Sequence, residues 1–166
     1  MTFFDAVFTR TYTPEWVIAT HLLVAIVLGA AIGFEREAKN RPAGLRTHML
    51  VALASAVVAV VTVELSKMVE ARGVHSDPVR ALEAVTAGVA FLAAGTIIQG
   101  RGKVEGLTTG AGMWLAGAVG VACGFGLLSI ALMAAVCAIF ILAALRRLAN
   151  HINPKTDDTT VIEHEK

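Results

Sequence analysis

Charge is scarce in this sequence. Only 16% of its 166 residues are charged, and the net charge of +1 is too small to indicate a nucleic-acid-binding surface. Aromatic residues make up just 6%, and the two cysteines, Cys123 and Cys137, lie in or beside apolar segments. Cysteines in such places are most often small packing residues, so we expect neither a disulfide nor a metal site from them. The length indicates one domain.

Catalytic motifs are missing as well. The sequence contains no GxSxG, HExxH, Walker loop or strand-linked GxGxxG, and its five histidines are scattered. We therefore expect no enzymatic activity and assign no catalytic residue.

Apolar residues, in contrast, are abundant and come in long blocks. They make up 56% of the chain, and the mean hydropathy is +0.70. Because a helix of about 20 apolar residues crosses a bilayer, the blocks predict an all-α integral membrane protein. Its five predicted transmembrane helices cover residues 16–34, 48–65, 81–98, 107–122 and 125–145.

The fourth block is the shortest, and only the sequence CGFG at residues 123–126 separates it from the fifth. Glycines permit a tight turn there, which would lie outside the bilayer. A re-entrant fourth segment is the alternative.

The basic residues predict the orientation of the helices. With the N-terminus outside, ten of the 14 Lys and Arg residues fall on the inner side and four on the outer side. This bias favours an N-out, C-in arrangement. Residues 1–147 then form the transmembrane domain, and residues 148–166 form a short polar cytoplasmic tail.

The chain also repeats itself at an offset of 62 residues. Residues 33–58 and 95–120 share eight identities over 26 aligned positions, and basic loop residues align too. We interpret this as two parallel copies of a helix hairpin followed by a fifth helix. Such a repeat implies a pseudo-two-fold axis along the membrane normal, and sites commonly lie at the interface between repeats.

Small residues at four-residue spacing indicate close helix packing. They either pack helices within one subunit, which is the simpler interpretation, or form the seam of a homodimer or other homo-oligomer. The predicted packing residues are Gly29, Gly33, Gly44, Gly88, Gly95, Gly106 and Gly110.

The inner loops of both predicted hairpins are basic and end in Gly-Leu-x-Thr, where the next helix begins. Thr47 and either Thr108 or Thr109 are natural N-caps, and two helix starts near Arg and Lys attract anions. Glu35 and Glu37 end the first helix, where the helix dipole disfavours acids. We therefore expect partners for them: neighbouring arginines, a residue of the second loop, or a bound cation.

The simpler alternative is that these charged residues only anchor the helix end at the membrane surface, with solvated, snorkelling side chains. Against it, the acids stand among basic residues, and Trp114 lies deep in the fourth block, away from the interfacial belts. The predicted functional cluster consists of Glu35, Arg36, Glu37, Arg46, Thr47, His48, Thr108, Thr109 and Trp114.

In the outer loop, Asp77 and Arg80 belong to a DPVR sequence. This is most simply a turn and a helix start. Alternatively, Asp77 could join Glu64, Glu70 and Glu83 in weak binding of a divalent cation.

Together these motifs resemble the MgtC/SapB family of bacterial inner-membrane proteins. The similarity rests on GFERE and PAGLRTH within residues 33–48, on DPVR at 77–80, and on GLTT at 106–109 with Trp114. It covers roughly residues 22–126. Ala84, Ala90 and Ala93 depart from the family's usual Gln and Gly residues, and the soluble C-terminal domain of the longer members is missing.

The resemblance implies a multi-pass protein of the bacterial inner membrane with a role in growth at low magnesium, in acid or intracellular stress, and in virulence. It suggests two activities. One is regulation of a membrane partner such as the ATP synthase, and the other is transport of Mg²⁺ or another small solute. A Mg²⁺ pathway needs carboxylates along a hydrated route, and the middle thirds of these helices supply none. Regulation is thus our first reading; Mg²⁺ remains a possible ligand, and nucleic acid is not an expected partner.

Overall fold

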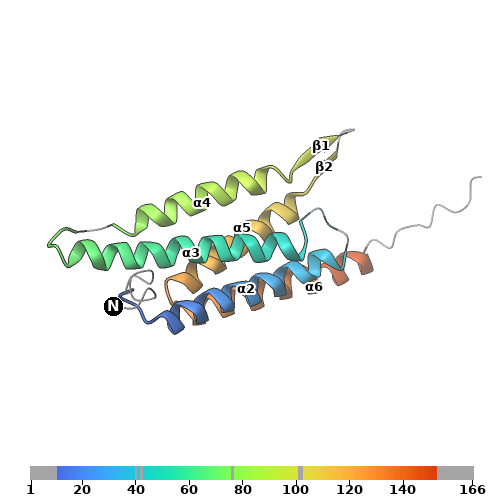
Figure 1. Ribbon diagram of the computed structural model, residues 1–166. Helices are drawn as coiled ribbons and strands as arrows, with labels where there is room; N and C mark the ends of the chain where they lie inside the picture. The colour runs from blue at the N-terminus through green and yellow to red at the C-terminus, as the bar shows by residue number, and fades with distance from the viewer. Residues whose placement is uncertain (1–10, 40, 42, 76, 101–102, 153–166) are drawn as a thin grey trace, which may run out of the picture.

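The computed structural model describes residues 11–152 apart from residues 40, 42, 76, 101 and 102. The described residues form five helices and one short β-hairpin, and successive helices run in alternate directions (Figure 1). The elements are α2 (Glu15–Glu37), α3 (Leu45–Glu70), α4 (Val79–Ala94), β1 (Ile98–Gly100), β2 (Lys103–Glu105), α5 (Leu107–Gly124) and α6 (Leu128–Ile152).

Helix α5 is the centre of the bundle. It packs against each of the other four helices, whereas α4 packs mainly on α5 and lies at the outside of the bundle (Figure 1). The composition of α5 permits this position, because it is rich in glycine and alanine and lets neighbouring backbones approach closely. Helix α4 therefore exposes most of its circumference.

Three helices, α2, α3 and α5, are long and apolar enough to cross a membrane. Helix α6 adds a shorter apolar stretch, Leu128–Ala143. The predicted all-α class and the number of helices are confirmed for the described part of the chain. Helix α6 continues to Ile152, which lies within the predicted tail 148–166, and residues 153–166 of that tail lie outside the described residues.

Glycines of α5 hold it against α3. A β-carbon added at Gly120 would fall on the carbonyl oxygen of Ala52, and one at Gly124 would fall on that of Ala56. Both alanines are fully buried. The two helices therefore meet backbone to backbone through the middle of the bundle.

Helix α5 starts at the predicted residue and α3 starts three residues earlier than predicted, and neither start has the predicted threonine cap. Helix α3 begins at Leu45 and α5 at Leu107, each directly after a glycine, so Thr47 and Thr109 lie inside the first turn and cap nothing. Gly106 has a φ of 91°, a backbone conformation that favours glycine, and its missing side chain makes room for the carbonyl oxygen of Thr96. The glycines, and not the threonines, set the helix starts.

The third helix was predicted to extend to residue 98, which is too far. Helix α4 stops at Ala94, where the Thr96 hydroxyl donates to the Ala93 carbonyl oxygen at 2.7 Å. Strands β1 and β2 then pair antiparallel, with Ile98 opposite Glu105. The β-branched run of Thr96 and two isoleucines favours this hairpin over another helical turn. The tight turn predicted after α5 is confirmed, with Gly126 at a φ of 77°.

Candidate functional site

The end of α2 carries a buried arginine with an acidic partner. Arg36 is only 5% exposed, and its Nε donates to Glu35 Oε2 at 2.6 Å. Glu35 also forms ion pairs with Arg36 Nη2 and with Lys39 Nζ. One carboxylate thus faces two cations, and the cluster carries a net positive charge.

Glu37 points to the next helix. Its Oε2 accepts a hydrogen bond from the backbone N–H of Leu45 at 3.0 Å, which satisfies one of the free donors at the start of α3. The side chain can reach this position because residue 44 is a glycine, whose β-carbon would otherwise collide with the carboxylate. A carboxylate at a helix N-terminus is also favoured by the helix dipole.

His48 is fully buried one turn into α3. Its Nδ1 lies 2.8 Å from the carbonyl oxygen of Gly44, which can only accept, so Nδ1 carries the ring proton. Nε2 is then an acceptor, and it has no hydrogen-bond partner within the described residues. It faces Gly112 of α5, where an added β-carbon would lie 3.2 Å away.

The glycines of α2 form the other wall around His48. A β-carbon at Gly29 would lie 2.8 Å from the His48 carbonyl oxygen, and one at Gly33 would lie 2.9 Å from the His48 β-carbon. This GxxxG pair therefore packs α2 onto α3 inside one chain. The imidazole lies in a slot between backbone segments of α2 and α5, which leaves it little freedom to reorient.

The remaining residues of the predicted cluster divide between two environments. Thr109 is buried on α5, one turn before Gly112, while Thr108 and Arg46 are exposed and Thr47 is half-buried. Trp114 lies further along α5 and faces α4. The structure thus brings His48 against α5 near Thr109, and leaves Arg46 facing outward and Trp114 in a separate groove.

The predicted packing glycines also divide. A β-carbon at Gly110 would lie 3.0 Å from the Ala93 carbonyl oxygen of α4, so this position holds α4 against α5. Gly88 has no atom within 4 Å of its added β-carbon, and Gly95 approaches only carbonyl oxygens of its own preceding turn. Gly88 on α4 and Gly95 at its C-cap are both exposed, so the expectation that they pack helices is not met among the described residues.

Asp77 and Arg80 lie at the opposite end of the bundle, where α3 connects to α4 (Figure 1). Asp77 Oδ1 accepts the backbone N–H of Val79, the first residue of α4, at 3.0 Å, and Pro78 is the N-cap, so the DPVR sequence forms a turn and a helix start as the simpler interpretation predicts. Across residues 11–152, as far as they are described, no group of three His, Cys, Asp or Glu side chains could hold a metal ion.

Sequence reasoning missed the role of Glu64. Its carboxylate accepts the backbone N–H groups of Tyr12 at 2.6 Å and Thr13 at 3.0 Å, while Lys67 Nζ donates to the Thr13 hydroxyl at 2.9 Å. These contacts tie the segment before α2 to the far end of α3. The pairing joins residues about 50 positions apart, and periodicity carries no signal for it.

Comparison with known proteins identifies the chain's relatives. The model of the MgtC family matches residues 22–151. The chain belongs to the MgtC family. The resemblance seen in GFERE, PAGLRTH and GLTT is thereby confirmed.

Three relatives show the breadth of the MgtC family. The chain is 42% identical to Protein MgtC of Brucella abortus (strain 2308) over 130 residues, which are 78% of this chain and 52% of that protein. It is 35% identical over 143 residues to Protein SrpB of Synechococcus elongatus, covering 81% of this chain and 78% of SrpB. It is 32% identical over 137 residues to the "Putative magnesium transporter YhiD" of Escherichia coli (strain K12), covering 82% and 63%.

The chain spans about half the length of the Brucella protein, at 52%. No solved structure shows a significant match to it. Family membership together with the long apolar helices makes this chain a membrane protein.

Proposed function

We propose that this chain is a magnesium-related protein of the bacterial cytoplasmic membrane that acts by binding and regulating another membrane protein. The family resemblance offers the ATP synthase as a candidate partner. In this proposal the five helices span the membrane with the N-terminus outside, so that the loop between α2 and α3 faces the cytoplasm. The alternating helix directions support this arrangement (Figure 1).

The closed middle of the bundle is the observation on which the proposal rests. Helices α3 and α5 meet at backbone distance around Gly120, where an alanine side chain would collide with Ala52. The buried polar or charged residues in the described part of the chain are Arg36, His48, Ser55 and Thr109, and none of them is a carboxylate. Mg²⁺ gives up its water reluctantly and is held by oxygen ligands, so this seam suits a packed support better than an ion path.

The cytoplasmic end has the properties of a docking platform. Glu35 and Glu37 are occupied by Arg36, Lys39 and the start of α3, so they hold the end of α2 beside the start of α3. Arg41 and Arg46 are exposed at this end of the two helices. Exposed basic residues beside such a contact favour a partner with an acidic surface.

Transport of a cation is the second candidate. It is favoured by the name of the relative YhiD, "Putative magnesium transporter". A carrier would have to open the α3–α5 seam during each cycle.

A charge reversal tests the regulatory proposal. Inverted membrane vesicles from cells with and without the protein are compared for ATP-driven proton pumping. We expect the protein to change the pumping rate and Arg46→Glu to remove that change while the protein remains in the membrane. Arg72→Glu, an equally exposed arginine beyond the other end of α3, serves as the matched control. Equal pumping with and without the protein would refute the ATP synthase as the partner.

A further inference from the structure

A groove of about 390 Å³ lies between the start of α2 and the second half of α3. Ile18 and Leu22 line it on α2, and Thr11, which precedes α2, lines it as well. On α3 the lining includes a stripe of exposed large apolar side chains, Val57, Val61, Leu65 and Met68. Glu64 is the charged side chain among the described lining residues. The groove is therefore apolar, with one carboxylate in its wall.

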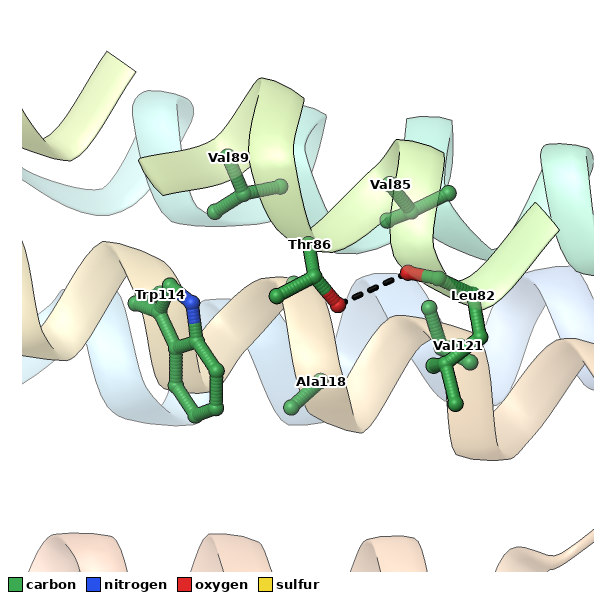
Figure 2. Close-up of a pocket in the computed structure, with 8 residues that line it drawn as sticks. Leu82, Val85, Thr86, Val89, Trp114, Ala118 and Val121 are labelled. Atoms are coloured by element: carbon green, nitrogen blue, oxygen red, sulfur yellow. Dashed lines mark hydrogen bonds between the residues drawn. The ribbon is translucent and has the colours of Figure 1, made fainter. Parts of the chain in front are cut away.

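Hydrogen bonds direct the start of the described chain to this groove. Glu64 accepts the backbone N–H groups of Tyr12 and Thr13. Thr11, the first described residue, then lies in the groove wall. The groove drawn in Figure 2 is instead lined by α4 and α5, with Trp114 on one side, and its described lining includes no residue before α2. The chain that precedes Thr11 therefore begins at the groove between α2 and α3.

Residues 1–10 lie outside the described residues, and their sequence, MTFFDAVFTR, is rich in phenylalanine. Phe4, Val7 and Phe8 follow the i, i+3, i+4 spacing of one helical face. Asp5 and Thr9 fall on the other side. This pattern predicts a short amphipathic helix. A helix of so few residues is not stable by itself in water, so it needs an apolar surface to pack against.

The groove has room for two aromatic rings of this segment. A cavity of about 150 Å³ holds one benzene molecule, and the groove has about 390 Å³. Phe4 and Phe8 lie about 6 Å apart along a helix. The lining from Val57 to Met68 covers about 16 Å of α3. We propose that the groove between α2 and α3 docks residues 2–9 of the same chain, with the rings of Phe4 and Phe8 inside it.

The position of the groove favours this occupant over a lipid acyl chain. In either orientation of a spanning bundle, the end of α3 and the start of α2 lie at one membrane surface. There, an amphipathic segment keeps Asp5 in water while its phenylalanines point into the protein. Because Thr11 is already in the groove wall, the segment also competes with lipid as part of the same molecule, at a high effective concentration. The docked segment covers the apolar stripe of α3 and clamps α3 to α2.

Cross-linking tests where the segment lies. The background is Cys137→Ser, which leaves only the buried Cys123. Phe8→Cys is added with either Leu65→Cys, which lies in the lining, or Ser66→Cys, which does not. A short bismaleimide is applied in phosphatidylethanolamine–phosphatidylglycerol vesicles, and each yield is divided by the labelling of the single cysteines. We expect intramolecular cross-links from Leu65→Cys and few from Ser66→Cys. Equal yields would mean that the segment is not docked, and no cross-link from Leu65→Cys would mean that lipid fills the groove; either result would overturn the proposal.

Alanine substitutions test the two rings. Phe4→Ala and Phe8→Ala should each lower the melting temperature in detergent micelles by about 5 °C, because they empty part of the groove. Phe3→Ala, at the edge of the apolar face, is the matched control and should shift the melting temperature by about 1 °C at most. Equal shifts for the three variants would mean that the segment contacts only detergent or lipid, contrary to the proposal.

Substitution of Glu64 tests how the segment is directed to the groove. Glu64→Gln exchanges one carboxylate oxygen for an amide nitrogen, which cannot accept, so one of the bonds to Tyr12 and Thr13 is lost. We expect the cross-link between positions 8 and 65 to lose most of its yield. Glu70→Gln, at the exposed end of α3, is the control and should leave the yield unchanged. An unchanged yield in Glu64→Gln would refute the lead from Glu64 on which the docking rests.

Discussion

At the scale of single residues, two glutamates in the last turn of α2 have different roles. Glu35 neutralises Arg36 and Lys39, and Glu37 caps the helix that begins eight residues later. Arg46, although it belongs to the same charged stretch of residues 33–48, is exposed. The position of a charged residue in this stretch therefore does not by itself show how much it contributes to stability. Substitutions in the stretch should change the free energy of unfolding by different amounts.

Glu35→Gln should destabilise the protein by about 3 kcal/mol, because it leaves the guanidinium of Arg36 buried without its counter-charge. Arg46→Gln should change the free energy of unfolding by less than about 0.5 kcal/mol, because the side chain is exposed. Unfolding in detergent micelles, followed by circular dichroism, measures both. Equal effects would mean that the Glu35–Arg36 pair is only a solvated anchor.

Glu37→Ala should cost about 1 kcal/mol through loss of the cap at Leu45. Glu37→Gln should retain part of the stabilisation by the cap, because its amide oxygen can still accept the hydrogen bond although it carries no charge. Glu83→Ala, on the exposed side of α4, is the control and should have little effect. If Glu37→Ala unfolds like the control, the cap contributes nothing to stability.

At the scale of helices, the packing of α5 depends on its glycines, which have no side chain. Its glycines allow α3 to approach near Ala52 and α4 to approach near Val89. Gly88 of α4, in contrast, faces away from the bundle and packs against no other helix of this chain. The position of a glycine in the packed bundle, and not its presence in a GxxxG pattern, decides its importance.

Two alanine substitutions separate these cases. Gly120→Ala should destabilise the protein by about 2 kcal/mol or more, since the backbone of α3 must move to admit a methyl group. Gly88→Ala should be neutral or stabilise by up to about 1 kcal/mol, because alanine is the better helix former. Thermal unfolding in the same detergent compares the two. A stable Gly120→Ala protein would refute the close α3–α5 contact.

Much of this architecture is predictable from the sequence. Long apolar blocks gave the helices, and the glycines around residue 126 gave the tight turn, because both depend on local properties. The start of α3 and the end of α4 were less predictable. The cap at Leu45 comes from Glu37, and the hairpin after α4 depends on strand pairing. The contact of Glu64 with Tyr12 and the slot around His48 depend on helices meeting in space, which no local pattern records.

At the scale of the whole molecule, the helices alternate in direction, so the α2–α3 connection and the end of α6 lie at the same end of the bundle (Figure 1). In our proposal the connection between α2 and α3 and the C-terminus share the cytoplasmic side, as the positive charges favour. A reporter fused after Lys166 should therefore be active in the cytoplasm. Periplasmic activity would reverse the orientation and move the proposed platform to the wrong side of the membrane.

The closed bundle is the central claim, and magnesium flux tests it most directly. The purified protein is reconstituted into liposomes that contain a magnesium-sensitive dye, and an ionophore added at the end verifies that the vesicles are sealed. With the α3–α5 seam packed around Gly120, uptake of Mg²⁺ should not exceed that of protein-free liposomes. Sustained, saturable uptake that depends on the protein would contradict the account and establish the chain as a transporter.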